Sequence, residues 1–313
     1  MTHMDNPSIS VVLPLYNHAH YIASTLQSVL EQTSPVDEII LIDDGSTDNG
    51  FSIAREMMND EPRATLLRQK NCGTEKTLNR AIELAQGEFI AVLNTDDLFL
   101  PTKIERCRKI IGDNPEIDFI SGGIGIIDEK GERLSGGETV EWLQRAAAFQ
   151  KKCRTLDLVF LNENSVTSTS NMVFSRELWR NCHGFQPLRY CHDLDFLLTA
   201  LSDHGVMIDM EQTHILYRVH KSNTIKENVL KARLEVAAVM ANAMKANSSR
   251  LLDAEHLTSD LLLISEIMRS KNNAALLSTL QILRNNCSDR HDFYTRLNNP
   301  ATSECLIRHF MEP

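Results

Sequence analysis

The first hundred residues alternate between short apolar runs and longer segments in which apolar residues recur at helical spacing. The apolar runs predict strands at Ile9–Leu13, Glu38–Ile42, Ala64–Leu67 and Glu88–Leu93. The intervening segments predict helices over Tyr21–Gln32, from Ser46–Asp48 to about Asn59, and over Glu75–Gln86. Strands that are apolar throughout are buried on both faces, and their alternation with helices is typical of a mostly parallel sheet. The pattern therefore predicts an α/β fold with helices flanking such a sheet.

The pattern changes after the first hundred residues. We expect a helix whose first turn contains Pro101, then a glycine-rich stretch from Asp118 to Gly137 with a hairpin turn at Asp128–Gly131. Further on we expect helices over Thr139–Lys152 and Leu194–Ser202, a strand within Ser165–Phe174, and short strands at Val206–Met210 and His214–Val219.

The last third of the chain is predicted to be helical. All 13 glycines lie at or before Gly205, so turns that require positive φ are not expected beyond it. Two apolar stripes at helical spacing follow, namely Leu230, Leu234, Ala237, Met240 and Met244, and then Leu257, Leu261, Ile264 and Met268. Such stripes are typical of helix faces packed in a core. The sequence thus predicts an α/β domain over residues 1–221 and an all-helical extension over residues 222–313.

Charge and composition exclude several classes of protein. The 313 residues include 32 basic and 42 acidic side chains, and residues 1–220 hold 20 of the basic and 32 of the acidic ones. Nucleic-acid binding depends on basic side chains that neutralise phosphates, so we expect no nucleic-acid partner. The apolar run Ile9–Tyr16 is too short for a transmembrane span, which needs about 20 residues. The N-terminus lacks a signal-peptide pattern and the seven cysteines include no Cys-x-x-Cys pair, so we expect a cytoplasmic protein with reduced thiols.

Polar residues follow the predicted strands of the first hundred residues. These clusters are Tyr16-Asn17, Asp43-Asp44, Asn71 with Gly73, and Asp96-Asp97. The carboxyl ends of parallel strands meet at one edge of the sheet, where ligands bind in open α/β folds. The sequence therefore predicts a ligand site formed by these clusters.

Adjacent carboxylates at Asp96 and Asp97 predict a divalent cation. Like charges at the end of a buried strand are unfavourable unless a cation neutralises them, and Mg²⁺ or Mn²⁺ binds such oxygens together with substrate phosphates. The alternative is that Asp97 caps the next helix and Asp96 is a solvated turn residue. The turn after the first strand contains Pro14, Tyr16 and Asn17 in place of Gly-x-Gly-x-x-Gly, so a dinucleotide site of the dehydrogenase type is not expected.

Taken in order, these segments resemble the family 2 glycosyltransferases. The resemblance is carried by residues 10–17, 28–33 and 42–48, by Asn71, Gly73 and Asn79, and by residues 87–90 and 94–97. They span about 100 residues, and later segments extend the resemblance to about residue 220. The resemblance implies a GT-A fold and a nucleotide-diphospho-sugar donor.

The resemblance also implies roles for individual residues. Pro14, Tyr16 and Asp44 would line the nucleobase pocket, with Tyr16 against the ring. Asn17, Asp43 and Asn79 are further donor-side positions, and Asp43 has a structural role as its alternative. Asp96 and Asp97 stand at the family's DxD motif, beside ribose and a diphosphate-bound Mn²⁺ or Mg²⁺, although Asn94 replaces the first acidic residue of that motif. We favour Asp97 as the metal ligand.

The segment Tyr190–Phe196 resembles the part of the family that supplies the catalytic base. His192 stands where the family has glutamate, Asp193 is the expected base, and Asp195 is the alternative if the register shifts. Asp193 as a helix N-terminal carboxylate is the structural alternative. A base here would take the proton of the acceptor hydroxyl, and a single displacement would invert the anomeric configuration.

Histidines offer further candidates. The segment Tyr217–Asn223 resembles a frequent family ending in which a histidine, here His220, reaches the metal or the diphosphate; an ordinary surface position is its alternative. His18 and His20 are expected at solvent-exposed positions at the start of a helix.

The sequence thus predicts an inverting glycosyltransferase that uses a UDP-sugar in polysaccharide biosynthesis. The acceptor would be a saccharide or a lipid-linked saccharide, contacted from residues 138–170. A non-catalytic nucleotide-sugar-binding or interaction module is the alternative, because Asn94 and His192 depart from the family pattern. The helical extension is a candidate for covering the acceptor site, for forming a homodimer, or for peripheral contact with the inner face of the membrane.

Overall fold

The computed structural model describes residues 6–201, 205–221, 223–224, 227–252, 254–271 and 274–311. The chain packs as two compact units. The first comprises Met1–Val140, Val166–Gly184 and Asp203–His220, and the second comprises Glu141–Ser165, Phe185–Ser202 and Lys221–Pro313. Residue 222, at which the predicted extension begins, lies outside the described residues. The division into residues 1–221 and 222–313 stays a prediction, and the two units are described separately.

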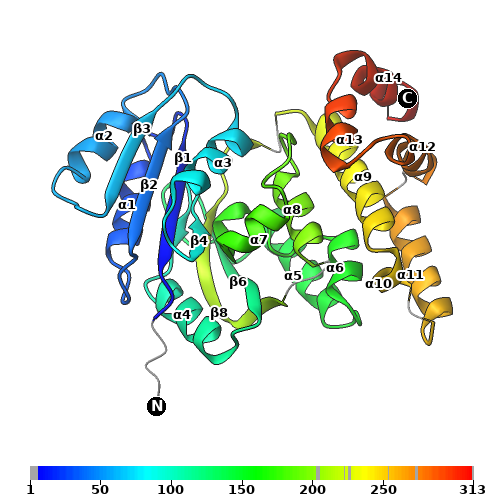
Figure 1. Ribbon diagram of the computed structural model, residues 1–313, viewed down its shortest axis with the longest axis horizontal. Helices are drawn as coiled ribbons and strands as arrows, with labels where there is room; N and C mark the ends of the chain where they lie inside the picture. The colour runs from blue at the N-terminus through cyan, green and yellow to red at the C-terminus, as the bar shows by residue number, and fades with distance from the viewer. Residues whose placement is uncertain are drawn as a thin grey trace. The chain divides into compact units, whose positions relative to one another are not determined.

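The first unit contains an eight-stranded sheet among its described residues, in the order β3-β2-β1-β4-β7-β6-β8-β5 (Figure 1). The strands are β1 Ile9–Leu15, β2 Glu38–Asp43, β3 Ala64–Arg68, β4 Phe89–Val92, β5 Leu98–Phe99, β6 Ile117–Ile127, β7 Val173–Ser175 and β8 Gly205–Arg218. β1 runs parallel to β2 and β4, β2 to β3, and β6 to β8, whereas β7 and β5 are antiparallel to their neighbours. The predicted mostly parallel sheet is confirmed.

Helices pack on this sheet, and all of them were predicted except the one over residues 176–181. They are α1 Ile22–Leu30, α2 Gly50–Met57, α3 Thr74–Leu84, α4 Lys103–Asp113 and α7 Arg176–Asn181, with a 3₁₀ turn η1 at Thr169–Asn171. Alternate residues of β1, from Ile9 to Leu15, join a core with α1, α2 and α4, because successive strand side chains point to opposite faces. The expectation that Pro101 lies in the first turn of α4 was wrong, because the helix begins at Lys103 with Thr102 as its N-cap.

The glycine-rich stretch contains a strand that the sequence did not predict. β6 runs over Ile117–Ile127, and its glycines allow β8 to approach closely. A Cβ atom on Gly122 would lie 2.2 Å from the His214 ring, and one on Gly123 would lie 2.9 Å from the Gln212 carbonyl oxygen. The two short strands expected after residue 205 are one strand, β8, whose register against β6 shifts at these glycines. The predicted turn at Asp128–Gly131 is confirmed by the hydrogen bond from Asp128 N to Glu132 O, 3.0 Å long.

The second unit is helical over its described residues. Its helices are α5 Glu138–Gln150, of which residues 141–150 belong to this unit, α6 Leu156–Asn162, α8 His192–Ala200, α9 Val229–Ala246, α10 Ser248–Leu251, α11 Leu257–Ser270, α12 Ala274–Asn285, α13 Arg290–Leu297 and α14 Pro300–Phe310. α9 contacts α8, α10, α12 and α14, and its stripe residues Leu234, Ala237 and Met240 are buried as expected. The stripe on α11 was wrong in part, because Leu257 and Leu261 are exposed. Within the described part of the chain, no helix combines the length and apolar character needed to cross a membrane.

Candidate active site

The polar clusters that follow β1, β2, β4 and β8 meet through hydrogen bonds in the first unit. Asn17 accepts a hydrogen bond from Thr47 N, 2.8 Å away, which links the turns after β1 and β2. His18 Nδ1 lies 2.9 Å from Thr95 Oγ1, which links the turns after β1 and β4. These contacts bring segments far apart in the sequence to the carboxyl edge of the sheet, where the strand pattern predicted a ligand site.

The turn after β1 leaves Tyr16 exposed and fixes Asn17. Asn17 has a φ of 53°, a left-handed conformation that asparagine tolerates, and its backbone N–H donates to Ser46 Oγ over 2.9 Å. Tyr16 is 44% exposed directly after β1, and Pro14 lies within β1 opposite Ile42. A flat ring beside a fixed turn is suited to packing against a nucleobase.

Asp43 and Asp44 are both buried and hold neighbouring loops. Asp43 Oδ2 lies 2.8 Å from Arg68 Nε, and its Oδ1 accepts from Ser46 N. Asp44 accepts from Cys72 N at 2.9 Å and from Gly73 N at 3.0 Å. These carboxylates therefore shape the turns that follow β2 and β3. Asn79, on α3, accepts a hydrogen bond from Trp179 Nε1 of α7 over 3.1 Å.

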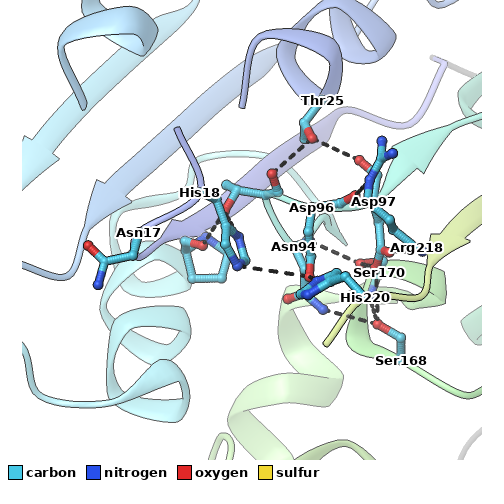
Figure 2. Close-up of polar contacts among 12 residues, drawn as sticks. Asn17, His18, Thr25, Asn94, Asp96, Asp97, Ser168, Ser170, Arg218 and His220 are labelled. Carbon is cyan, nitrogen blue, oxygen red and sulfur yellow. Dashed lines mark hydrogen bonds and ion pairs between the residues drawn. The ribbon is translucent and has the colours of Figure 1, made fainter. Parts of the chain in front are cut away.

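Asp96, His18 and His220 form a cluster of metal-ligand atoms (Figure 2). His220 Nε2 lies 3.0 Å from Asp96 Oδ2, His18 Nε2 lies 3.9 Å from the same oxygen, and one ligand atom of each residue lies within 4.8 Å of the others. The expectation that His18 is solvent-exposed was wrong, because its ring packs between Thr95 and Asp96 and is 26% exposed. His20 is exposed, as expected.

The pKa shifts of His18 and Asp96 suit a cation. Burial lowers the pKa of His18 and outweighs the nearby Asp96 carboxylate, which favours the neutral imidazole. Burial alone would raise the pKa of Asp96, but the His220 hydrogen bond and the electrostatic interactions with both histidines outweigh it and lower that pKa. A neutral imidazole and an ionised carboxylate are the forms that bind metals.

Asp97 is held differently from Asp96. Its Oδ1 accepts from Arg218 N at 2.9 Å, and its Oδ2 accepts from the Ser170 hydroxyl. Burial, together with the Asp96 charge, raises the pKa of Asp97 well above its usual value. The Asp97 carboxylate thus joins the turn after β4 to β8 and η1, whereas the Asp96 carboxylate faces the two histidines.

Asn94, the departure from the acidic motif, anchors the η1 region. Its backbone amide donates to Ser170 Oγ and its Nδ2 to Ser168 Oγ, each over 3.0 Å, and its Oδ1 accepts from Thr169 Oγ1. A carboxylate could not donate the Nδ2 bond. Ser168 and Thr169, which lie in the segment expected to contact the acceptor, are therefore engaged in holding the turn after β4.

Arg218 braces the same turn from β8. Its Nε donates to Asp96 O over 2.7 Å, its Nη1 donates to Asp128 O, and its guanidinium lies 4.8 Å from the centre of the Tyr21 ring. The side chain is 3% exposed. Arg218 therefore fixes the backbone that carries Asp96.

Asp193 lies in the first turn of α8, in the second unit. Its Oδ1 accepts from Leu194 N at 2.7 Å and its Oδ2 accepts from Asn164 Nδ2 at 3.0 Å. Burial raises the pKa of Asp193 to about 6. Asp195, the alternative base, is 1% exposed, accepts from the Tyr294 hydroxyl and pairs with Arg290 at 3.2 Å. The two aspartates therefore differ in their surroundings, and Asp195 is the one committed to an ion pair.

A match to a family model shows the protein family of this chain. The model for glycosyl transferase family 2 matches residues 10–181, more than half of the chain. The chain belongs to glycosyltransferase family 2. It is thus a sugar-transferring enzyme, as the resemblance implied.

The matches to relatives of this glycosyltransferase cover very different shares of those relatives' own lengths. An uncharacterized glycosyltransferase of Methanocaldococcus jannaschii is 25% identical over 234 residues, 74% of this chain and 77% of its own. An uncharacterized glycosyltransferase of Rickettsia conorii is 37% identical over 195 residues, 62% of this chain and 29% of its own.

Solved structures share the fold. S. aureus TarS in complex with UDP-GlcNAc has a TM-score of 0.58 at 14% identity, covering 88% of this chain and 88% of that one. The mannosyltransferase PcManGT from Pyrobaculum calidifontis, in complex with GDP-Man and Mn²⁺, has a TM-score of 0.55 at 18% identity, covering 97% and 86%. The predicted GT-A fold is confirmed.

Lys103 is a residue of this glycosyltransferase that the sequence analysis missed. It is 1% exposed, its Nζ donates to Ser170 O over 2.7 Å, and it lies 4.0 Å from the centre of the Phe99 ring. Burial lowers its pKa to about 7. Helical spacing could have revealed it, because residue 103 shares a face with Ile104 and Cys107, both buried.

Proposed function

We propose that this glycosyltransferase moves a sugar from a UDP-sugar to a hydroxyl of a saccharide or lipid-linked acceptor, with inversion at the anomeric carbon. The observation that carries the proposal is the grouping of Asp96, His18 and His220 at the carboxyl edge of the sheet. An exposed tyrosine, Tyr16, follows the neighbouring strand. A ring-binding surface and a cation site at one edge suit a nucleotide joined to a diphosphate.

The donor atoms of the cluster fit a divalent cation, and Mn²⁺ better than Mg²⁺. Mg²⁺ prefers oxygen ligands and keeps several waters, whereas two imidazoles with one carboxylate suit a softer transition ion. A bound cation would neutralise negative charge on the departing diphosphate. We favour Asp96, His18 and His220 as its ligands. The ligand role of Asp97 stays a prediction, and its bonds to Ser170 and Arg218 count against it.

For the donor we propose that Tyr16 and Pro14 face the base. Asn17, Asp43, Asp44 and Asn79 would shape the surrounding loops, given the contacts that each makes. The names of two structural neighbours, TarS with UDP-GlcNAc and PcManGT with GDP-Man and Mn²⁺, support a nucleotide-sugar in general. The choice of UDP as the particular nucleotide is proposed beyond what these names support.

We propose Asp193 as the base. A carboxyl group with a pKa of about 6 is ionised near neutral pH and is still basic enough to accept a hydroxyl proton. It would take this proton as the acceptor oxygen attacks the anomeric carbon opposite the leaving diphosphate, so one displacement inverts the configuration. Asn164, which donates to Asp193 Oδ2, would orient the carboxylate. Asp195 is the weaker candidate because Arg290 and Tyr294 already engage it.

Partners and location are part of the same proposal. A cytoplasmic protein, peripheral membrane contact, a homodimer through the C-terminal helices and a role in polysaccharide biosynthesis all stay predictions.

A ligand screen followed by a transfer assay tests the proposed function. We expect UDP-sugars with Mn²⁺ to raise the melting temperature, since a ligand that binds the folded state stabilises it by mass action. One of them should then be consumed by transfer, giving a product of inverted configuration by NMR. Stabilisation by GDP-mannose in place of any UDP-sugar would overturn the donor, and a retained configuration would overturn the mechanism. UDP binding without hydrolysis or transfer across the acceptors would favour the non-catalytic alternative.

A further inference from the structure

The segment that carries Asp193 is held by the C-terminal helices of its own unit. We call residues 186–195 the base segment. It comprises the loop before α8 and the first turn of that helix. Side chains from α9 and α13, and one that follows α13, bond to it at several points.

The first hold is the Glu235 carboxylate of α9. Its Oε1 accepts from Arg189 N at 3.0 Å, and its Oε2 accepts from Tyr190 N at 2.7 Å and from Cys191 N at 3.1 Å. Glu235 is 5% exposed. One buried carboxylate therefore pairs three successive backbone amides immediately before α8, and bonds to an ionised acceptor are stronger than bonds between neutral groups.

The second hold comes from α13. The Tyr294 hydroxyl donates to Asp195 Oδ1, and Arg290 Nη1 lies 3.2 Å from Asp195 Oδ2. Tyr294 is fully buried. Nearer the start of the segment, His291 Nδ1 lies 3.2 Å from Gln186 Oε1, and Asn298 Nδ2 donates to Pro187 O. Asp193 thus lies between Cys191, held by α9, and Asp195, held by α13.

We propose that Glu235 and Tyr294 are positioning residues, through which the C-terminal helices hold the base segment in the geometry that catalysis requires. The inference rests on the proposed role of Asp193. Displacing a reacting group by about 1 Å can cost about 100-fold in rate, so bonds on both sides of the base would control kcat. The helical extension is then part of the catalytic machinery.

One substitution tests the bonds from α9, and another tests the bonds from α13. Glu235→Gln keeps the shape but places an amide NH₂ group against backbone N–H donors. Tyr294→Phe keeps the buried ring and removes the hydroxyl. The matched controls are Glu266→Gln on α11 and Arg296→Gln on α13, both exposed; Arg296 pairs with Asp292 of its own helix. If Tyr294→Phe does not fold, Arg290→Gln removes the other partner of Asp195.

The measurements separate positioning from stability. We expect amide hydrogen exchange across residues 186–195 to become faster in both test variants, and kcat to fall about 10–100-fold. The Kd for UDP with Mn²⁺ and the KM for the donor should stay unchanged, because the first unit supplies the proposed donor site. Both controls should match the wild-type protein.

Two results would overturn the inference. Unchanged amide exchange in residues 186–195 would show that these bonds do not keep the base segment in place. Faster exchange with unchanged kcat would show that the bonds order the segment but do not contribute to catalysis. Asp193→Asn, measured in parallel, reports on the proposed function itself. If that variant keeps full activity, Asp193 is not the base, whereas the exchange data still report on the hold.

Discussion

His220 Nε2 lies 3.0 Å from Asp96 Oδ2, although the two residues are 124 positions apart in the sequence. The contact joins the end of β8 to the turn after β4, and His18 reaches the same oxygen from the turn after β1. Three segments thus contribute one ligand atom each. Arg218 and Asp97 hold the β4 turn in place, so the cluster is supported by buried bonds.

His18 is predicted to contribute to metal affinity. Replacing His18 by alanine removes one of three donor atoms, and we expect Mn²⁺ binding in the absence of nucleotide to weaken by at least about tenfold. His20→Ala is the matched control, because His20 is exposed two residues away. Electron paramagnetic resonance of free Mn²⁺ gives both affinities. Equal affinity in the two variants would remove His18 from the ligand set.

Asp97 is predicted to matter for stability. Asp97→Ala removes the acceptor of the Arg218 amide and the Ser170 hydroxyl, and should lower the free energy of unfolding by about 1–3 kcal/mol. Asp97→Asn should cost less or stabilise, because burial already raises the pKa of this carboxyl and disfavours its charge. Urea unfolding of both variants measures this. An asparagine variant less stable than the alanine variant would contradict the assignment.

Activity should depend on pH through Asp193. Its pKa is raised to about 6, so the carboxylate is protonated as the pH falls below that value, and kcat/KM should fall by about tenfold per pH unit there. The raised pKa also means that the charged form costs stability above pH 6. Asp193→Asn should therefore abolish transfer and raise the free energy of unfolding at neutral pH by about 1–3 kcal/mol. A pH profile at saturating Mn²⁺ that stays flat down to the usual aspartate range would contradict this role.

Lys103 is predicted to make stability rise with pH. Its pKa is lowered to about 7 in the folded protein, so the unfolded chain binds the extra proton from pH 7 up to the usual lysine range. The free energy of unfolding should therefore increase through this window, relative to a Lys103→Met variant. Lys109→Met, at an exposed position of the same helix, serves as the control. If wild-type and Lys103→Met proteins show the same pH slope, the lysine is not buried as described.

Local patterns predicted β1–β4 directly, β8 as two shorter strands, a strand that overlaps β7, and the family. The apolar runs that form β1–β4 can be recognised without knowledge of their partners, because a strand buried on both faces is apolar at nearly every position. β6 was not predicted because glycine has a low strand propensity. Gly122 and Gly123 are needed there for the close approach of β8, which lies about 90 residues later in the chain.

The sequence likewise identified several residues of the candidate site but not the contacts that they make. The sequence placed Asp96, Asp97 and His220 among the candidates, but the bonds of Asp97 to Arg218 of β8 and Ser170 of η1, and the contact of His220 with Asp96, depend on the fold. His18 was set aside because a histidine near a helix start is usually solvated, and its burial depends on Thr95 and Asp96. The sequence left Asp193 and Asp195 as alternatives, and α13 now distinguishes their surroundings.

Calorimetric titration of UDP with and without Mn²⁺, into the wild-type protein, Asp96→Asn and Asp97→Asn, tests the metal-dependent donor site most directly. Mn²⁺ should strengthen UDP binding to the wild-type and Asp97→Asn proteins and should leave UDP binding to Asp96→Asn unchanged. Loss of the Mn²⁺ effect in Asp97→Asn with its retention in Asp96→Asn would contradict the assignment of the metal to Asp96, His18 and His220.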